Sequence, residues 1–448
     1  MRHVLILGLG ESGFAMARWC DRHGARVRVA DTRAAPPYLG ELGSRVPGAT
    51  FVAGEFEKSL LEGVDLVALS PGLSGGLMVV LHARAMGIPV VGEAELFARA
   101  LDGSETVIAI TGTNGKTTTT ALAGHLCRAA GKRTTVAGNI SPSLLTALMA
   151  EEQRPEIWVL ELSSFQLETA ETLDADAAVV LNVSDDHLDR YVNLDEYASA
   201  KARIFAGSGA QVLNRQDGRV KRMAIPGRRL LTFGLDAPGD ENDFGLRENR
   251  EEPWIVQGDR FLSPVSQLPI AGLHNAANAM AALALCAAVG LDPAALLPAL
   301  REFRGLPHRV EKIAEIDGVA YYDDSKGTNV GATVAALQGM GRKVVVILGG
   351  DGKGQDFSPL KEAVARHARA AVLIGRDGPA IGAALGGCGV PVEPAADLAG
   401  AVSKSAAAAR RGDAVLLSPA CASFDMFRNY EHRAEVFADA VRRLGARA

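Results

Sequence analysis

Short apolar runs recur along the chain, and most of them stop at glycine or polar residues that precede a helical pattern. In the first hundred residues these runs are HVLIL, RVRVA and VDLVAL, and IPVVGEAELFARAL closes the block. Strands that alternate with helices predict a parallel sheet in an α/β domain. The polar link LDGSE, at 101–105, predicts the end of this domain, which we place at residues 1–103.

Two further blocks repeat this pattern. The runs VIAIT, TTVAG, EIWVLELS, AAVVLNVS and AQVLN predict a central sheet, and 271–291 predicts an apolar helix that stops at glycine. Residues 215–265 are richer in charge and predict hairpins and loops. GLPHR, at 305–309, contains the glycine and proline that are typical of a linker. We therefore place the central domain at 104–305 and the C-terminal domain at 306–448. The predicted fold class is α/β with three domains.

Polar residues follow the strands of all three blocks, as in VAYYDDSKGTN, VVVILGGDGKG and AVLLSPACASF. In open parallel sheets the ligand crevice lies at the carboxyl ends of the strands. The functional residues are therefore expected at these strand exits.

The segment VIAITGTNGKT is the strongest chemical signal. A strand that enters a glycine loop and opens a helix presents free N–H groups and the positive helix end to an anion. Lys116 would reach the outer phosphates, and the Thr117 hydroxyl would bind magnesium. The usual pattern would place a glycine at Ile110, and a glycine turn before a surface helix is the alternative. The loop predicts binding of ATP or GTP.

A second glycine motif, GLGESG, opens the chain. Gly8, Gly10 and Gly13 match the dinucleotide fingerprint, and Asp31 follows near the expected distance. Taken alone, the motif is as consistent with a dehydrogenase as with another protein that binds a nucleotide diphosphate. A chain with two nucleotide cradles favours the joining of two substrates over hydride transfer.

Candidate metal ligands follow two central strands. Glu161 in ELSSFQLE and His187 in NVSDDHLDRY are suitable magnesium ligands beside Thr117. Spacing alone leaves three rival ligands open, namely Asp185, Asp186 and Asp189. A surface position is the ordinary expectation for Lys201, in the helical segment EYASAKARIF.

Composition narrows the class of protein. The 448 residues are 48% hydrophobic and 22% charged, which is typical of a soluble globular chain of two or three domains. A net charge of −5 argues against nucleic-acid binding. The longest apolar helical segment is too short to insert in a membrane, and no signal peptide is predicted. Five cysteines without paired spacing fit a cytoplasmic protein.

Eight motifs, taken together and in order, resemble those of the Mur ligases of peptidoglycan synthesis, closest to the branch that adds D-glutamate. They are TGTNGKTTT, ELSSFQLE, NVSDDHLDRY, GLHNAANA, GLPHR, DDSKGTN, GGDGKG and SPACASFDMF. The resemblance implies a Rossmann-like domain for a UDP-sugar, a central P-loop ATPase domain and a Rossmann-like C-terminal domain for the amino acid.

The chemistry implied by the resemblance is ATP-dependent amide formation. The carboxylate of UDP-N-acetylmuramoyl-L-alanine would attack the γ-phosphate of ATP, giving an acyl phosphate and ADP. The amine of D-glutamate would then attack the activated carbonyl, and phosphate would leave. Two magnesium ions and Lys116 would neutralise charge on the transferring group.

The resemblance also implies a role for individual residues. The catalytic set is Lys116, Glu161, His187 and Lys201, and the metal ligands are Thr117, Glu161, His187 and a carbamylated Lys201. The ATP site comprises Gly112, Thr113, Asn114, Gly115, Lys116, Thr117, Thr118, Asn275, Asn278, Arg309 and Asp324. The UDP-substrate site comprises Ser12, Asp31, Thr32, Arg33, Ser70, Asn139 and His187. The D-glutamate site comprises Lys326, Thr328, Lys353, Ser423, Phe424 and Tyr430.

One residue departs from this scheme. Glu11 places a carboxylate beside a pyrophosphate site, so we expect its side chain to point away or to contribute only its backbone N–H. Competing interpretations are another ligase of the superfamily, such as the L-alanine-adding enzyme or folylpolyglutamate synthetase, a nicotinamide dehydrogenase, and a non-catalytic nucleotide-binding module.

Overall fold

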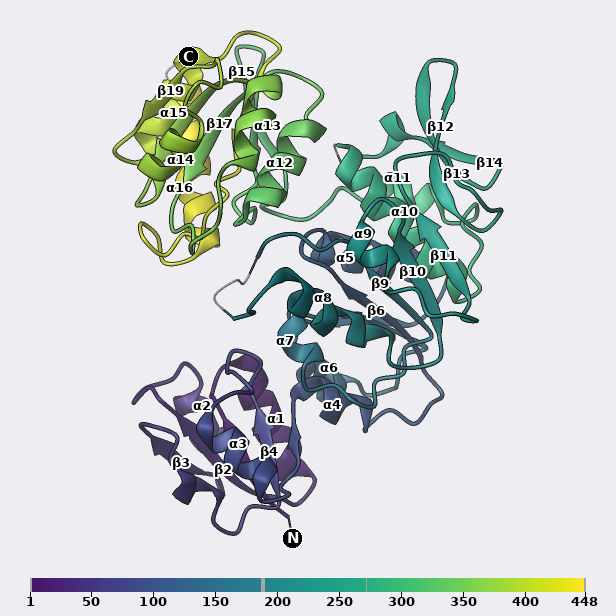
Figure 1. Ribbon diagram of the computed structural model, residues 1–448, viewed down its shortest axis with the longest axis vertical. Coiled ribbons are helices and arrows are strands. Elements are labelled where there is room, and N and C mark those ends of the chain that lie inside the picture. The colour runs from purple at the N-terminus through teal and green to yellow at the C-terminus, as the bar shows by residue number, and fades with distance from the viewer. Residues whose placement is uncertain (1, 187–189, 271, 447–448) are drawn as a thin grey trace.

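The computed structural model describes residues 2–186, 190–270 and 272–446 and contains three sheets, one in each predicted block. Figure 1 shows the central domain lying between the N-terminal domain and the C-terminal domain. Among the described residues, no helix combines the length and apolarity required to cross a membrane.

The first domain holds a five-stranded parallel sheet in the order β3-β2-β1-β4-β5. Its strands are β1 (His3–Leu7), β2 (Arg26–Asp31), β3 (Thr50–Ala53), β4 (Leu66–Leu69) and β5 (Val90–Val91). Its helices are α1 (Glu11–Arg22), α2 (Leu39–Arg45), the 3-10 helix η1 (Lys58–Leu61) and α3 (Met78–Ala85). The helix α4 (Glu93–Ala98) leads into the central domain.

The central domain holds nine strands in the order β14-β13-β12-β11-β10-β9-β6-β8-β7. The strands are β6 (Thr106–Thr111), β7 (Thr134–Gly138), β8 (Ile157–Glu161), β9 (Ala177–Val180), β10 (Ala210–Asn214), β11 (Leu230–Phe233), β12 (Phe244–Asn249), β13 (Glu252–Gln257) and β14 (Arg260–Pro264). The run from β7 to β12 is parallel, and β12, β13 and β14 form an antiparallel meander. The hairpins predicted within 215–265 are confirmed there, and β11 joins the parallel part.

The helices of the central domain cover both faces of this sheet. They are α5 (Lys116–Ala129), α6 (Leu144–Ala150), α7 (Ser164–Leu167), α8 (Leu194–Ala202), η2 (Arg203–Phe205), α9 (Gly218–Lys221), η3 (Val265–Gln267), α10 (Leu273–Ala288) and α11 (Leu297–Glu302). Helix α10 is apolar and buried around most of its circumference, which explains its alanine-rich sequence as that of a core helix.

The C-terminal domain holds six strands in the order β15-β16-β20-β17-β18-β19. The strands are β15 (Glu311–Ile316), β16 (Val319–Asp323), β17 (Val344–Gly349), β18 (Ala368–Ile374), β19 (Val392–Pro394) and β20 (Ala414–Leu417). The helices are α12 (Val330–Gly339), α13 (Pro359–His367), α14 (Gly378–Ala384), α15 (Leu398–Ala408) and α16 (Tyr430–Gly445). The sheet is parallel except for β15, an antiparallel edge strand. Its charged sequence, EKIAEI, lacks the apolar run from which the other strands were predicted.

The first and central domains share one hydrophobic core. A single cluster joins residues of β1 and α1 to residues of α6 and β8, and the ring of Phe97 in α4 meets Trp158 edge-on with centroids 5.1 Å apart. The clusters of the C-terminal sheet contain only residues from Val310 onward. Relative motion of domains is therefore expected at the GLPHR linker and not at residue 103.

Close helix–strand packing in the first domain requires Gly13. A methyl group at this position would lie 1.9 Å from the carbonyl oxygen of Gly8. Because backbone cannot move aside as a flexible side chain does, we expect Gly13→Ala to lower the free energy of unfolding by about 3 kcal/mol in denaturant titration. Gly10→Ala is the control: no atom lies within 4 Å of its added methyl group, and the expected loss is below about 0.5 kcal/mol. Equal stability of the two variants would contradict this packing.

Candidate active site

The phosphate-type loop lies between β6 and α5 and depends on two glycines. Gly112 and Gly115 have φ of +155° and +85°. A methyl group on Gly115 would lie 2.3 Å from Oδ1 of Asn278, and one on Gly112 would lie 2.9 Å from the Leu181 side chain. Only glycine fits at these two positions, so the loop can bring its backbone close to a ligand.

Lys116 is folded back over this loop. Its Nζ donates hydrogen bonds of 2.8 Å to the carbonyl oxygens of Gly112 and Thr113. Burial lowers the pKa of Lys116, while the carboxylates of Glu161 and Asp186 oppose that shift. The amino group is therefore held at the mouth of the loop, where phosphate oxygens can replace the two carbonyls.

Asn182, just after β9, hydrogen-bonds to the loop through both its side chain and its backbone. Its Oδ1 accepts the N–H of Asn114 at 2.8 Å, and its Nδ2 donates to the carbonyl of Asn114 at 3.0 Å. Its own carbonyl accepts the N–H of Thr113 at 2.9 Å. Sequence reasoning missed this residue, although its place at a strand exit within the NVSDD motif was a usable signal.

Lys201, in α8, is buried, with 1% of its surface exposed, so the expectation of a surface lysine is wrong. Its Nζ donates to the carbonyl of Gly112 at 2.9 Å and lies 4.3 Å from the ring centroid of Tyr197. Burial lowers the pKa of Lys201 well below its ordinary value, the charge of Lys116 adds to that effect, and Asp186 opposes it. The structure thus places two lysines against one loop carbonyl.

Glu161 and Thr117, two of the predicted metal ligands, both line the cavity. The Glu161 carboxylate is buried, and its Oε1 accepts a 2.8 Å hydrogen bond from Nδ2 of Asn139. Its Oε2 is buried and has no hydrogen-bond partner among the described residues. The Thr117 hydroxyl accepts a hydrogen bond from Arg309 of the C-terminal domain.

Of the other candidate ligands, Asp186 is buried and lines the same cavity, whereas Asp185 is exposed. His187 and Asp189 lie outside the described residues, so the choice between them and Asp186 stays open.

Helix α10 supplies two amides on the opposite wall. Nδ2 of Asn278 donates to Oδ1 of Asn275 at 3.1 Å, and both side chains are buried at the cavity. This wall lies directly against Gly115, as expected for residues that contact a nucleotide held in the loop.

The C-terminal domain brings charged groups of both signs. Asp324 accepts a 2.7 Å hydrogen bond from the hydroxyl of Ser418, and burial raises its pKa to about 7. Burial lowers the pKa of Lys326 to about 8, and its Nζ lies 3.7 Å from the ring centroid of Tyr430. Arg309 is half-buried, and partial removal from water lowers the pKa of its guanidinium.

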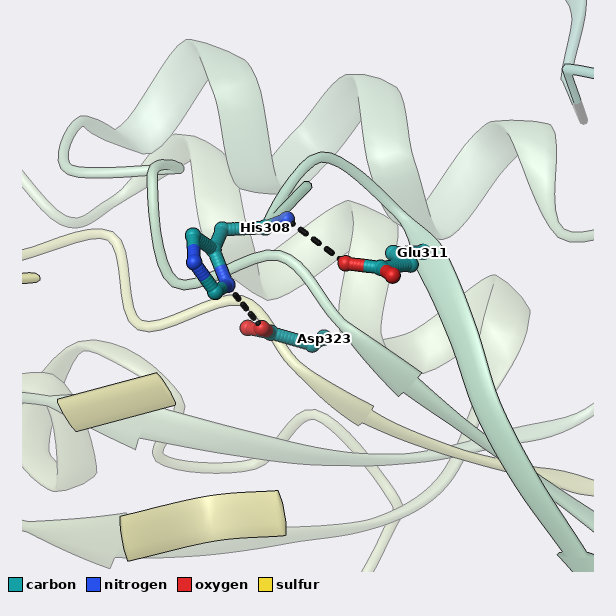
Figure 2. A group of neighbouring side chains, drawn as sticks. All are labelled: His308, Glu311 and Asp323. Carbon is teal, nitrogen blue, oxygen red and sulfur yellow. Dashed lines mark hydrogen bonds and ion pairs between the residues drawn. The ribbon is translucent and has the colours of Figure 1, made fainter. Parts of the chain in front are cut away.

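The linker is pinned just before Arg309. His308 has φ of +62°, and Glu311 Oε2 accepts its backbone N–H at 2.9 Å. Nδ1 of His308 lies 2.6 Å from Oδ2 of Asp323, as Figure 2 shows. The three side chains bring possible metal-binding atoms within 4.8 Å of one another. The His308–Asp323 contact joins two side chains, whereas Glu311 accepts the backbone N–H of His308.

Two further contacts connect the C-terminal domain with the loop region. Nδ2 of Asn329 donates to Oδ1 of Asn114 at 3.0 Å, and Nζ of Lys353 lies 3.7 Å from Oδ1 of Asp186. Sequence reasoning missed Asn329, because only the tertiary fold shows which loop faces it.

These walls enclose a cavity of about 940 Å³ to which all three domains contribute. Predicted site residues that line it are Thr113, Asn114, Gly115, Lys116, Thr117, Thr118, Asn139, Glu161, Asn275, Asn278, Arg309, Asp324, Lys326, Thr328 and Tyr430. The cavity brings together a phosphate-type loop, carboxyl and hydroxyl oxygens, and the cationic side chains of Lys116, Arg309 and Lys326. These are groups that could activate a carboxylate with a nucleoside triphosphate.

Other predicted residues lie outside the cavity lining. Lys353 pairs with Asp186, Ser423 is buried, and 73% of the Phe424 surface is exposed. In the first domain, Ser12, Asp31, Thr32, Arg33 and Ser70 lie at the carboxyl ends of β1, β2 and β4. They form a separate edge, next to the cavity residue Glu11.

Asp31 is engaged within this edge. Its Oδ2 accepts the N–H of Leu9 at 2.7 Å, and the hydrogen-bonded guanidinium of Arg33 lowers its pKa to about 2. The carboxylate therefore stabilises the glycine-rich turn after β1.

Glu11 does more than offer its backbone N–H. Its Oε1 accepts hydrogen bonds from the N–H of Ser143 at 3.1 Å and the hydroxyl of Ser141 at 3.3 Å. The side chain is thus turned toward the central domain.

Comparison with known proteins gives matches along the whole chain. Family models match in three segments: the Mur ligase MurD-like N-terminal domain at residues 2–92, the Mur ligase middle domain at 110–286, and the Mur ligase glutamate ligase domain at 308–421. The UDP-N-acetylmuramoylalanine--D-glutamate ligase of Aromatoleum aromaticum is 59% identical, over 99% of this chain and 97% of its own. The enzyme of the same name from Ralstonia nicotianae is 56% identical over the same shares.

Solved structures share the fold at low identity. A pseudomurein peptide ligase type C from Methanothermus fervidus aligns with a TM-score of 0.63 at 18% identity, over 99% of this chain and 100% of that chain. The UDP-N-acetylmuramate-alanine ligase of Thermotoga maritima aligns with a TM-score of 0.61 at 21% identity, over 99% of both chains.

Proposed function

The chain belongs to the Mur ligase family, and from that premise we propose that the cavity shared by its three domains joins D-glutamate to UDP-N-acetylmuramoyl-L-alanine. The reaction is an ATP-dependent, ADP-forming ligation in peptidoglycan biosynthesis. Relatives that carry the name of this activity are 59% and 56% identical over nearly the whole chain. The observation that carries the proposal is the position of Lys116, Asp324 and Lys326 around one cavity.

The first step activates the L-alanine carboxylate. One of its oxygens attacks the γ-phosphorus of ATP, the bond to the bridging oxygen breaks, and ADP leaves with the electron pair. A carboxylate is a poor electrophile, so the phosphoryl group supplies the leaving group for the second step. Lys116 and Arg309, both half-buried beside the loop, would stabilise the charge that develops on the transferring phosphoryl oxygens.

The second step forms the amide. The amine of D-glutamate attacks the acyl carbon, loses a proton, and displaces inorganic phosphate. Lys326 and Thr328 line the cavity and would bind the carboxylates of D-glutamate. The Lys326 ammonium makes a cation–π contact with the ring of Tyr430. Lys353, Ser423 and Phe424 would act from the neighbourhood of this pocket. Once its carboxyl group is ionised, Asp324 would bind Arg309 or the amine of D-glutamate.

Magnesium fits the donor set on the central domain. The free buried oxygen of Glu161 and the Thr117 hydroxyl would hold one ion, and Lys201 as a carbamate, with His187, would hold the other. When bound, magnesium supplies charge neutralisation for phosphoryl transfer. The lowered pKa of Lys201 supports the carbamate, because a neutral buried amine is the form that reacts with carbon dioxide.

The nucleotide sugar would lie along the first domain, with its diphosphate at the start of α1. Ser12, Asp31, Thr32, Arg33 and Ser70 surround that edge, and Asn139 would contact the sugar where the edge opens into the cavity. We place the reaction in the cytoplasm, where ATP and nucleotide sugars occur and where five free cysteines stay reduced.

The direct test is phosphate release with ATP, magnesium and UDP-N-acetylmuramoyl-L-alanine while the amino acid is varied. We expect release that depends on D-glutamate, with L-alanine, L-glutamate and glycine inactive. Absence of stimulation by D-glutamate would refute the assignment.

A further inference from the structure

Glu93 is a buried carboxylate at the boundary between the first and central domains. It is the first residue of α4, and 1% of its surface is exposed. It forms no ion pair with a described Lys or Arg side chain, and its Oε2 lacks a hydrogen-bond partner in the described part of the chain. A buried polar atom without a partner is costly, so its retention requires an explanation.

The partners of Glu93 come from two other helix starts. Its Oε1 accepts the backbone N–H of Leu145, the second residue of α6, at 2.9 Å. The hydroxyls of Ser12, the second residue of α1, and Ser143, the N-cap of α6, lie near the carboxyl group and oppose the rise in its pKa that burial causes. One side chain therefore connects the diphosphate cradle of the first domain to the segment that follows Asn139.

Glu11 makes the same connection closer to the cavity. It accepts hydrogen bonds from Ser141 and Ser143, so two acidic side chains hold the 141–145 segment against the start of α1. Asn139, just before that segment, donates to Glu161 in the catalytic part of the cavity. The geometry of the cradle is thereby tied to that of the phosphoryl-transfer site.

We infer that Glu93 is a positioning residue for the nucleotide sugar: through Ser12, Ser143 and Leu145 it fixes the α1 cradle relative to the Asn139 segment. The inference rests on the proposed function, since it assigns the UDP moiety to this cradle. Glu93 is not among the residues that line the cavity proposed for ATP and D-glutamate, so it would act on the nucleotide sugar through Ser12.

The charge state of Glu93 suits this role. Burial raises the pKa of its carboxyl group, and the neighbouring Glu11 carboxylate raises it further. The neutral form, which these two effects favour, would accept hydrogen bonds without adding the charge of Glu93 to that of Glu11 beside the diphosphate. Glutamine reproduces the neutral acceptor, and methionine retains only the volume.

Glu95, two residues further along α4, provides a matched control. It is equally buried, and its carboxylate accepts the N–H groups of Glu171 and Thr172 at 2.6 and 2.8 Å and pairs with Arg99. Glu95 therefore connects α4 to the central domain without contacting either the cradle or the cavity lining.

The test measures steady-state KM for each of the three substrates, with thermal unfolding in parallel. We expect Glu93→Met to raise the KM for UDP-N-acetylmuramoyl-L-alanine about tenfold, because about one to two hydrogen bonds are lost. The KM values for ATP and D-glutamate should change less than about twofold. Glu93→Gln should stay within about twofold of wild type. Glu95→Met should lower the unfolding midpoint and leave all three KM values unchanged.

Should Glu93→Met fail to fold, Ser143→Ala removes one of the hydroxyls that reach Glu93 and is expected to raise the same KM about threefold. An unchanged KM for the UDP substrate in a folded variant, or an equal rise in all three KM values, would overturn the inference. These results presuppose a wild-type enzyme that releases phosphate with D-glutamate, so they are distinct from failure of the proposed function.

Discussion

Replacing Lys116 with alanine is expected to reduce turnover by about 1,000-fold or more while the fold survives. Within the described part of the chain, the Lys116 amino group donates only to two carbonyls of its own loop, so its removal breaks no hydrogen bond between distant described segments. The charge it would offer to the transferring phosphoryl group has no substitute on the loop itself. Phosphate release in the D-glutamate assay measures the loss, and thermal unfolding measures the fold.

Lys132→Ala is the matched control for this experiment. Lys132 lies beyond the far end of the same helix, α5, in a half-exposed ion pair with Glu156. Exposed pairs of this kind contribute little, so turnover should stay within about twofold of wild type. Near-normal turnover in Lys116→Ala would mean that the loop does not hold the reacting phosphates.

The chemistry of the loop was accessible from the sequence because it is local. Directly after a strand, two glycines with positive φ, a lysine and a threonine lie within six consecutive positions, and each of them has a physical reason to be there. The missing glycine at Ile110 proved compatible with the function, since the end of β6 occupies that position. The same locality made the strands and the α10 helix predictable.

Contacts between domains were not accessible in this way. Asn329 faces Asn114 across 215 positions of sequence, and Arg309 reaches Thr117 across 192. No periodicity encodes such pairs, because they depend on how separate sheets pack together. Glu11 shows the consequence: its charge conflicted with a diphosphate site until the structure revealed Ser141 and Ser143 as its partners.

Burial of single polar residues was equally hidden. The helix around Lys201 is weakly amphipathic and carries acidic residues in its first turn, a pattern typical of a solvated helix. The structure instead places Lys201 beneath the loop, where its amine contacts the carbonyl of Gly112. The structure also weakens the dehydrogenase interpretation, because the Asp31 carboxylate already pairs with Arg33 and accepts the backbone N–H of Leu9.

Lys201→Ala is expected to reduce turnover by about 100-fold or more and to regain activity when a short-chain carboxylate such as acetate or propionate is added. Carbamylation joins the neutral amine to carbon dioxide through a new N–C bond and releases a proton, so the side chain becomes a carboxylate. Burial, which lowers the Lys201 pKa, favours the neutral amine that this reaction needs. In the alanine variant the vacated space beside Gly112 would admit a free carboxylate in the same place. Turnover as a function of carboxylate concentration is the measurement.

Two variants separate this rescue from a general effect of added salt. Lys116→Ala should gain nothing from the same carboxylates, because a carboxylate cannot replace a cation at the phosphates. Lys201→Arg should also stay inactive in both conditions, since a guanidinium is always charged and cannot capture carbon dioxide. If Lys201→Ala retains wild-type turnover, or if no carboxylate restores it, the carbamate is wrong. Lys201 would then serve the loop only as the donor to Gly112 that the structure contains.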